Sequence, residues 1–315
     1  TPLYSSAASD VYKRQIIEID SLTIIYAPGS SGKSWVAQHL AVLADAGYST
    51  DAYMVEPAKV LYLDWETTKS ELDVRVTMIR RGMGLQGRSN IKYRTMYAGI
   101  VSDLERIQEI IVEEDITFVV IDSVASACGG EAESAKVVLD TFNSIRSLNV
   151  STLAIDHTNK DNQLFGSVYK FNEARNVFEL VKKQESDEQK IIIGLFHRKA
   201  NNGPIIGDLG TSLTFANNQA VFTRVNIRDT SLEEHQSVRE RIRNLLRSGP
   251  ETPGNIATLL DKGEGNIRTV LSTGVKDGLF VLVKDLATGK STGRYGLAVP
   301  YAFEEAGGEE EWFLE

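Results

Sequence analysis

From residue 16 onward, short apolar runs alternate with longer segments whose apolar residues recur at helical spacing. Four runs are apolar enough to be strands buried on both faces: SLTIIYA, VLYLDWE, ITFVVIDS and VSTLAIDH. Three segments have the period of amphipathic helices: KSWVAQHLAVLADAG, TKSELDVRVTMIRRGMG and SAKVVLDTFNSIRSLN. Two later runs predict strands joined by a polar turn: EARNVFELVKKQ and QKIIIGLFHRK. The alternation predicts an α/β domain over residues 16–227, with a mostly parallel sheet that helices cover on both faces.

The pattern changes after a polar stretch, residues 228–236, which we interpret as a linker. Three helical segments follow, and then two strand-like runs separated by a turn. These segments are SVRERIRNLLRSG, TPGNIATLLD, GEGNIRTVLSTGVKDG and LFVLVKDLATGKSTGRYGLA. Three helices followed by a β-hairpin is the order of a winged helix. We therefore predict a small winged-helix domain over residues 237–299.

Both ends of the chain differ from the segments between them. The first fifteen residues, TPLYSSAASDVYKRQ, are similar to a translated adapter sequence, so we interpret residues 1–15 as a non-native or disordered leader. Residues 300–315 are predicted to be an acidic tail that is too charged to pack. Its end, EEEWFLE, is similar to the tails with which replication proteins bind their partners, so a replication partner is expected there.

Composition narrows the class of protein. Hydrophobic residues make up 42% and charged residues 24% of the chain, which is typical of a globular protein. No stretch of the sequence reaches the ~20 apolar residues that a membrane span needs. The single cysteine, Cys128, cannot form an internal disulfide and suits a reducing compartment. We therefore expect a cytoplasmic protein, in the host cytoplasm if a phage encodes it.

The segment APGSSGKS, residues 27–34, follows a predicted strand and opens a predicted helix. This is the context of a P-loop, in which backbone N–H groups and the positive end of the helix bind phosphate oxygens. Lys33 is expected to reach the β- and γ-phosphates of ATP, and Ser34 to ligate Mg²⁺. Alanine stands where the motif usually has its first glycine. The expected nucleotide-binding residues of this segment are Ala27, Pro28, Gly29, Ser30, Ser31, Gly32, Lys33, Ser34 and Trp35.

Acidic residues follow two other predicted strands. Asp122 ends the run TFVVID, where an aspartate can hold Mg²⁺ beside the P-loop. Glu66 lies just past the run VLYLD, where a carboxylate can polarise the attacking water as a general base. The same position also suits a glutamate that only stabilises the start of a helix. Asp64 is the competing carboxylate for this role, and the alternation of side chains along the strand favours a structural role for it.

This succession of motifs resembles that of the RecA-like ATPases. The segment AIDHTNKD places His157 and Thr158 where that superfamily has a γ-phosphate sensor. The segment FGSVYKFNEARNVFELVK resembles a block of the RepA-type hexameric replicative helicases and, more loosely, of the DnaB type. The segment GLFHRKANNGP resembles the basic stretch that precedes a Gly-Pro pair in the DnaB type. Together the resemblance covers residues 16–225.

The resemblance implies an ATP-dependent DNA helicase or translocase, of phage or plasmid origin, that hydrolyses ATP at subunit interfaces and moves on single-stranded DNA. It implies a homo-oligomer, expected to be a hexameric ring, because Arg198 and Lys199 match basic residues that enter the neighbouring subunit's ATP site. Which of the two does so stays open, since their spacing to the Gly-Pro pair differs from DnaB. The expected catalytic residues are Lys33, Glu66, His157, Arg198 and Lys199.

DNA contacts are expected in two places. In the resembled helicases, loops at a central channel bind single strands, and residues 157–175 and 125–136 hold those positions. The basic and aromatic side chains of the first loop are Lys160, Phe165, Tyr169, Lys170, Phe171 and Arg175. In the predicted winged helix, the candidates are Asn266, Arg268, Lys276, Lys284, Lys290 and Arg294. Residues 229–300 hold ten basic and nine acidic residues, so a protein partner suits this domain equally well.

Two other interpretations share the nucleotide site. A RecA- or RadA-like recombinase or mediator would form filaments and pair strands without unwinding them. A regulatory ATPase would use the winged helix to dock a partner. The appended winged helix and the lack of an N-terminal DNA-binding module in this sequence favour the helicase over the recombinase.

Overall fold

The computed structural model describes residues 16–51, 53–131, 134–158, 168–184, 189–202, 205–284 and 288–298. The chain divides into two compact units, Thr1–Leu232 and Glu233–Glu315. The expected leader, residues 1–15, and the expected acidic tail, residues 300–315, lie outside the described residues. Among the helices that are described, none is long and apolar enough to cross a lipid bilayer.

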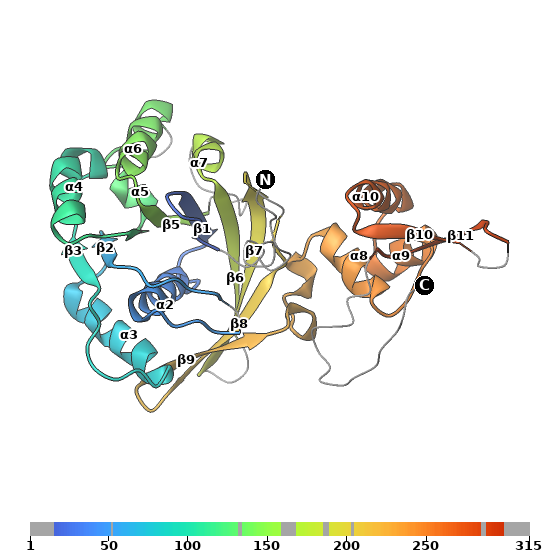
Figure 1. Cartoon of the computed structure of the whole chain (residues 1–315), viewed down its shortest axis with the longest axis horizontal. Coiled ribbons are helices and arrows are strands. Elements are labelled where there is room, and N and C mark those ends of the chain that lie inside the picture. Colours follow the sequence, from blue (N-terminus) through green and yellow to red (C-terminus); the bar gives the residue numbers. More distant parts are fainter. Residues whose placement is uncertain are drawn as a thin grey trace, which may run out of the picture. The chain divides into compact units, whose positions relative to one another are not determined.

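The first unit is built on one nine-stranded sheet with the order β3-β2-β4-β5-β1-β6-β7-β8-β9 (Figure 1). The strands are β1 (Leu22–Ala27), β2 (Val60–Asp64), β3 (Lys92–Thr95), β4 (Phe118–Asp122), β5 (Ser151–His157), β6 (Asn176–Gln184), β7 (Lys190–Ala200), β8 (Leu209–Ala216) and β9 (Gln219–Val225). All neighbours from β3 to β6 pair in parallel, whereas β7, β8 and β9 extend the sheet in antiparallel fashion. The predicted mostly parallel sheet is therefore confirmed.

Helices cover both faces of this sheet (Figure 1). On one face lie α2 (Lys33–Ala46) and α3 (Lys69–Gly82); on the other lie α4 (Leu104–Glu113), α5 (Val124–Ala127) and α6 (Ala135–Ser147). Two neighbouring residues of β1 illustrate this arrangement. Ile25 packs in the core beneath α2 and α3, Ile24 packs in the core beneath α4, α5 and α6, and both are fully buried. The strands read as continuous apolar runs because both of their faces are buried.

Local signals explain where the two long helices on the first face begin and end. Helix α2 follows Gly32 and is capped by Gly47, whose φ of 59° is a left-handed conformation that glycine adopts readily. Helix α3 begins after Thr68, whose side chain forms a capping box with Glu71. At the other end of α3, a Cβ on Gly82 would lie 2.2 Å from the carbonyl oxygen of Ala220. Glycine at position 82 therefore lets α3 close onto β9.

Several elements of the first unit were not predicted. Strand β3 is a polar edge strand without a buried residue, so no apolar pattern marks it. Strands β8 and β9 form a hairpin whose turn, Asn217 and Asn218, has positive φ angles of 50° and 56°. An Asn-Asn turn was the available signal, because asparagine tolerates this conformation. The other unpredicted elements are α4, α5, α7 (Val168–Glu173), η1 (Ile100–Asp103) and η2 (Ile227–Asp229).

The expected linker contains residues of the first core. Ile227, just before it, and Leu232, within it, are buried against Ile192 and Phe196 of β7. A short turn of helix, η3 (Glu233–His235), then opens the second unit.

The second unit contains α8 (Val238–Leu246), α9 (Pro253–Leu260), α10 (Glu264–Lys276), β10 (Phe280–Lys284) and β11 (Ser291–Leu297). Ser237 and Thr252 cap α8 and α9, and Pro253 occupies the first turn of α9. Strands β10 and β11 pair in antiparallel fashion. The three helices and the hairpin surround a core of their own, formed by Ile242, Leu246, Ile256, Ala257, Leu260, Ile267, Leu271 and Phe280. The predicted elements are therefore present in the predicted order.

Candidate functional site

Residues 27–34 connect β1 to α2 and have the shape of an anion-binding loop. Ser30 and Gly32 have positive φ angles of 58° and 91°, and a Cβ on Gly29 would have no other atom within 4 Å. A backbone that alternates in this way turns successive N–H groups toward one concave side. The hydroxyl of Ser31 is buried and has no hydrogen-bond partner among the residues that the structure describes. The loop therefore offers donors that fit a phosphate.

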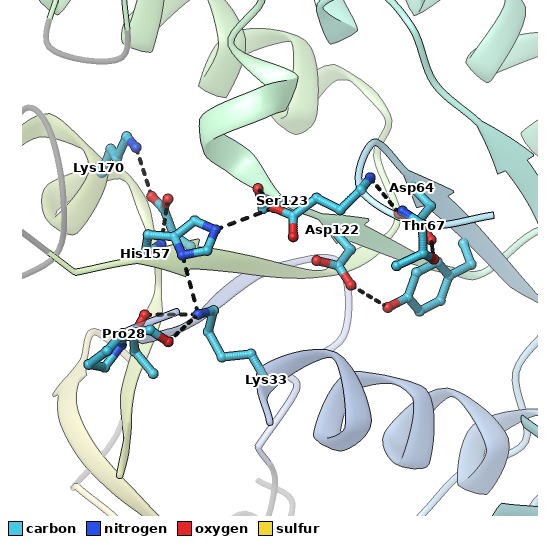
Figure 2. A network of polar contacts seen from close by, with 12 residues as sticks. Pro28, Lys33, Asp64, Thr67, Asp122, Ser123, His157 and Lys170 are labelled. Carbon is cyan, nitrogen blue, oxygen red and sulfur yellow. Dashed lines mark hydrogen bonds and ion pairs between the residues drawn. The ribbon is translucent and has the colours of Figure 1, made fainter. Parts of the chain in front are cut away.

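Lys33 is the first residue of α2, at the end of this loop, and is only 6% exposed. Its ammonium donates to the carbonyl oxygens of Ala27 and Pro28, at 2.8 Å each, and lies 3.4 Å from Nδ1 of His157 (Figure 2). Burial lowers the pKa of Lys33, and the negative charges of Glu66 and other nearby carboxylates oppose that shift. In the described part of the chain, Lys33 forms no ion pair. Its charge is therefore only partly balanced within the protein, and an anion would complete the balance.

Glu66 and His157 lie next to Lys33 at the carboxyl ends of their strands. Oε1 of Glu66 accepts a hydrogen bond of 2.6 Å from the hydroxyl of Ser123 and lies 3.3 Å from Nε2 of His157. The side chains of Glu66 and His157 are 39% and 35% exposed, so solvent and ligands can reach them. The hydrogen bond from His157 is the main cause that lowers the pKa of Glu66 to about 2, against the effect of burial. Glu66 is therefore an ionised acceptor that faces open space.

Asp64 holds the turn that carries Glu66. Its carboxylate accepts hydrogen bonds from the backbone N–H groups of Glu66 and Thr67, at 2.8 and 2.9 Å, and from the hydroxyl of Thr67. Helix α3 starts directly afterwards at its cap, Thr68. Asp64 is completely buried, and these contacts agree with the structural role that the alternation suggested.

Asp122 lies at the end of β4, in the interior of the site. It is 1% exposed and accepts a hydrogen bond of 2.8 Å from the hydroxyl of Tyr62. Burial raises the pKa of Asp122 to about 6, while hydrogen bonds from Tyr62 and Ser34 lower it. A buried carboxylate beside a serine hydroxyl is a set of hard oxygen donors. Ser34 and Asp122 therefore fit a Mg²⁺ ion, whose charge would offset the burial of the carboxylate.

Strand register explains why residues distant in sequence meet here. Ala27 at the end of β1 pairs with His157 at the end of β5, and the N–H of Thr158 donates to the carbonyl oxygen of Ala27. Asp64 of β2 likewise pairs with Asp122 of β4. Because these strands are parallel, their carboxyl ends share one edge of the sheet. Figure 2 shows Lys33, His157, Ser123 and Asp122 gathered at this edge.

Trp35 follows the loop in the first turn of α2. Its indole ring packs edge-on against Phe215, with 4.9 Å between ring centroids, and the guanidinium of Arg75 lies 5.5 Å from its centroid. Trp35 is partly exposed and thus stands at the border between the loop and the core.

Arg198 and Lys199 lie outside the network around Lys33. Arg198 forms an ion pair of 2.7 Å with Glu179 and lies 5.1 Å from the ring centroid of Phe196. The ammonium of Lys199 donates to three backbone carbonyl oxygens at the end of α7, at distances of 2.7 to 2.8 Å. These carbonyls belong to Phe171, Asn172 and Ala174. Lys199 thus caps a helix, whereas Arg198 presents a guanidinium on the sheet face.

The expected DNA-contacting loops look different in the structure. Lys170 is not a surface residue, because its ammonium pairs with the buried carboxylate of Asp156, which requires a counter-charge. Arg175 is exposed. In the other loop, residues 124–127 form α5, and Cys128 after it is buried in the core, so this part is not a free loop. Lys160, Phe165 and the side chain of Tyr169 lie outside the described residues.

In the second unit, the candidate basic residues lie at the surface. Arg268 forms an ion pair with Glu264 one helical turn away. The remaining candidates are also exposed: Asn266, Lys276, Lys284, Lys290 and Arg294.

Sequence reasoning missed three residues of the site. Tyr62 binds Asp122, Ser123 binds Glu66, and the ammonium of Lys182 donates to the carbonyl oxygen of Ser30 at 2.6 Å. Ser123 could have been found, because it follows Asp122 directly at the end of the apolar strand. Tyr62 and Lys182 lie within strands, where no local pattern distinguishes them.

Comparison with known proteins identifies the family. The AAA domain family matches residues 6–163. Among solved structures, the chain is similar to a KaiC-like protein from the hyperthermophilic archaeon Pyrococcus horikoshii OT3, with 16% identity and a TM-score of 0.47 over 66% of this chain and 93% of that chain. A comparison with curated proteins gives no significant match. The family match spans half of the chain and includes the P-loop, Glu66, Asp122 and His157, so the chain belongs to the AAA domain family and is a RecA-like P-loop ATPase.

Proposed function

We propose that this protein is an ATP-driven DNA helicase or translocase of the RecA class that moves on single-stranded DNA. The observation that carries the proposal is the cluster of Lys33, Glu66 and His157 at one edge of the sheet. Lys33, which forms no ion pair with any residue that the structure describes, lies there beside an ionised carboxylate that faces open space. Such a pair suits a reaction in which an anionic group is bound and a water is directed at it.

Each residue of the cluster has a role in this proposal. The N–H groups of the P-loop and Lys33 bind the phosphates of ATP, and Ser34 and Asp122 hold Mg²⁺. When bound, Mg²⁺ supplies positive charge to the phosphate oxygens. Glu66 accepts a hydrogen bond from the attacking water, and Ser123 fixes the orientation of Glu66. His157 lies between Lys33 and Glu66 and links the phosphate-binding side to the water-binding side.

The site is completed in this proposal by a neighbouring subunit. Of the two basic candidates, Arg198 is the better finger, because a guanidinium binds phosphate oxygens with two parallel hydrogen bonds. Lys199 is engaged with three backbone carbonyl oxygens of its own subunit, whereas Arg198 pairs with Glu179 and would exchange that carboxylate for phosphate oxygens. A finger that acts in trans requires side-by-side assembly, which we propose to be a hexameric ring.

DNA is the proposed track for this motor. Support comes from the resemblance of residues 16–225 to replicative helicases and from the exposed Arg175 beside α7. The second unit is proposed to be a winged helix, because its three helices precede a hairpin. Lys284, Lys290 and Arg294 are exposed on that hairpin and suit phosphate contacts, although a protein partner remains the alternative.

Mixing two inactive variants tests the assembled site. Lys33→Ala removes the phosphate-binding lysine, and Arg198→Ala removes the finger. Each variant alone should lose ATP hydrolysis, whereas a mixture of the two should regain part of it, because some interfaces combine an intact P-loop with an intact finger. Lys199→Ala is the matched control, which should hydrolyse ATP alone. A mixture that stays inactive in assembled particles would contradict a finger that acts in trans.

A further inference from the structure

A fully buried ion pair lies directly behind the ATP site. The ammonium of Lys170 donates to Oδ2 of Asp156 at 2.8 Å, and both side chains are 0% exposed. Asp156 is the residue before His157 in β5, and Lys170 belongs to α7. Figure 2 shows Lys170, His157 and Lys33 in one network of polar contacts, which continues from Lys33 to Pro28. The ion pair therefore connects β5, which carries His157, to α7.

The second oxygen of Asp156 acts on His157 itself. Oδ1 of Asp156 accepts a hydrogen bond of 2.8 Å from the backbone N–H of His157. The ring of His157 then reaches Lys33 through Nδ1 and Glu66 through Nε2. One carboxylate thus holds both Lys170 and the backbone of the residue that joins the two sides of the site.

Helix α7 is itself held in place at several points. Lys199 binds its last carbonyl oxygens, and Arg146 of α6 forms an ion pair with Glu173 at its surface. The N–H of Arg175, just after the helix, donates to the carbonyl oxygen of Leu22 in β1. Lys170 is therefore delivered to Asp156 by a helix whose position is fixed independently of the ATP site.

We infer that Asp156 and Lys170 are positioning residues for His157: Lys170 fixes the carboxylate of Asp156, and Asp156 fixes the backbone of His157 between Lys33 and Glu66. This inference rests on the proposed ATP hydrolysis at that site. Both side chains are fully buried, so they act on the site through His157.

Stability alone is a poor explanation for the pair. Removing two charges from water costs about as much as their attraction returns, so apolar residues of similar volume usually stabilise a core at least as well. What an apolar pair cannot provide is a directional acceptor for the N–H of His157. The ion pair keeps that acceptor in one orientation, because Oδ2 is occupied by Lys170 and Oδ1 faces His157.

The test separates positioning from folding with a neutral pair. Lys170→Met alone leaves Asp156 buried without its partner and is expected to unfold at a lower temperature. The double variant D156N/K170M carries neither charge of the pair, so it should recover most of the melting temperature that Lys170→Met loses. If the pair positions His157, kcat for ATP hydrolysis in the double variant should still fall by about 10–100-fold. KM should change by less than about twofold, because the P-loop is intact.

A second readout does not depend on turnover. The chain has four histidines, so the ring resonance of His157 can be assigned in a ¹H–¹³C spectrum by its loss in His157→Gln. It should shift in D156N/K170M and stay unchanged in Arg146→Gln, which breaks the surface ion pair on the same helix. A double variant with wild-type kcat and an unmoved His157 resonance would overturn the inference. If the wild type hydrolyses no ATP, the proposed function fails, and the resonance alone still decides whether the pair positions His157.

Discussion

Two buried lysines lie on opposite sides of His157 and have opposite surroundings. Lys170 in the α7 region has a dedicated carboxylate, Asp156, at 2.8 Å. Lys33 in the P-loop region has carbonyl oxygens at 2.8 Å and no ion pair among the described residues. Both are almost inaccessible, since Lys170 is 0% and Lys33 6% exposed. The charge of Lys170 is therefore balanced by Asp156, whereas no carboxylate among the described residues forms an ion pair with Lys33.

This difference shows how the role of a buried charged residue can be inferred from its partners. An ammonium that is neutralised inside the protein serves the structure around it. An ammonium that is buried with only carbonyl oxygens costs stability in the free protein, and burial accordingly lowers the pKa of Lys33. Such a cost is retained where an anionic ligand removes it. The P-loop region is therefore built for a ligand, and the α7 region supports it.

The same substitution at both positions tests this contrast, and the largest effect is expected at Lys33. Lys33→Met should reduce ATP hydrolysis by at least about 10²–10³-fold, because the positive charge that Lys33 places beside the phosphates is lost. Its melting temperature without ligand should equal or exceed that of the wild type, since a penalised cation has been removed. Steady-state hydrolysis and thermal unfolding measure the two effects. A marked loss of stability would show that Lys33 also supports the fold.

At position 170 the same substitution should act on stability. Lys170→Met leaves the carboxylate of Asp156 buried without a partner, which typically costs about 3–5 kcal/mol. Chemical denaturation compares its unfolding free energy with that of Lys33→Met. Equal stabilities of the two variants would remove the distinction between a paired and an unpaired lysine.

His39 is a third buried basic residue, and in this account no ligand balances its charge when it is protonated. Burial lowers its pKa to about 3, and its ring stacks on Phe222 with 3.9 Å between centroids. Because the folded pKa lies below the unfolded value of ~6.5, stability is present above pH ~6.5 and is lost as the pH falls toward 3. At pH 5 the loss amounts to about 2 kcal/mol. Urea unfolding at pH 7 and pH 5 should show a smaller loss in His39→Phe.

The exposed His235 provides the control for this titration. His235→Gln removes a histidine whose side chain is 39% exposed rather than buried, and it is compared with His39→Phe in the same unfolding experiment. If His39→Phe behaves like the wild type, burial of His39 does not determine the acid sensitivity.

The smallest effect is expected at Lys199. It donates to three carbonyl oxygens at the end of α7, but it lies near the surface, so Lys199→Ala should cost only about 1 kcal/mol. The same denaturation experiment measures it. A loss as large as that of Lys170→Met would mean that α7 depends on its cap more than on the buried ion pair.

The site was predictable where short motifs coincide with a rule of topology. Lys33 follows from a local glycine-rich loop, and Asp122, Glu66 and His157 follow because parallel strands bring their carboxyl ends to one edge. The same rule predicted the mostly parallel sheet. Strands β3, β8 and β9 were not predicted, because they are partly polar and lie toward the two edges of the sheet.

Residues whose role depends on a distant partner were not predictable. The sequence predicted Lys170 as a basic residue at the surface of a polar loop, but in the structure it is buried and pairs with Asp156. Tyr62 looked like an ordinary strand residue, although its hydroxyl binds Asp122. Arg198 and Lys199 were indistinguishable in sequence, and only the structure shows that Lys199 caps α7 whereas Arg198 pairs with Glu179. In each case the deciding contact comes from another element.

The most direct test of the proposed motor is the rate of ATP hydrolysis by the wild-type protein with Mg²⁺, measured with and without single-stranded DNA. We predict hydrolysis that single-stranded DNA stimulates severalfold and that Lys33→Met abolishes under both conditions. Hydrolysis that does not respond to single-stranded DNA would contradict the motor and favour a regulatory ATPase. A wild-type protein that hydrolyses no ATP under either condition would contradict the assignment of Lys33, Glu66 and Asp122 as an active site.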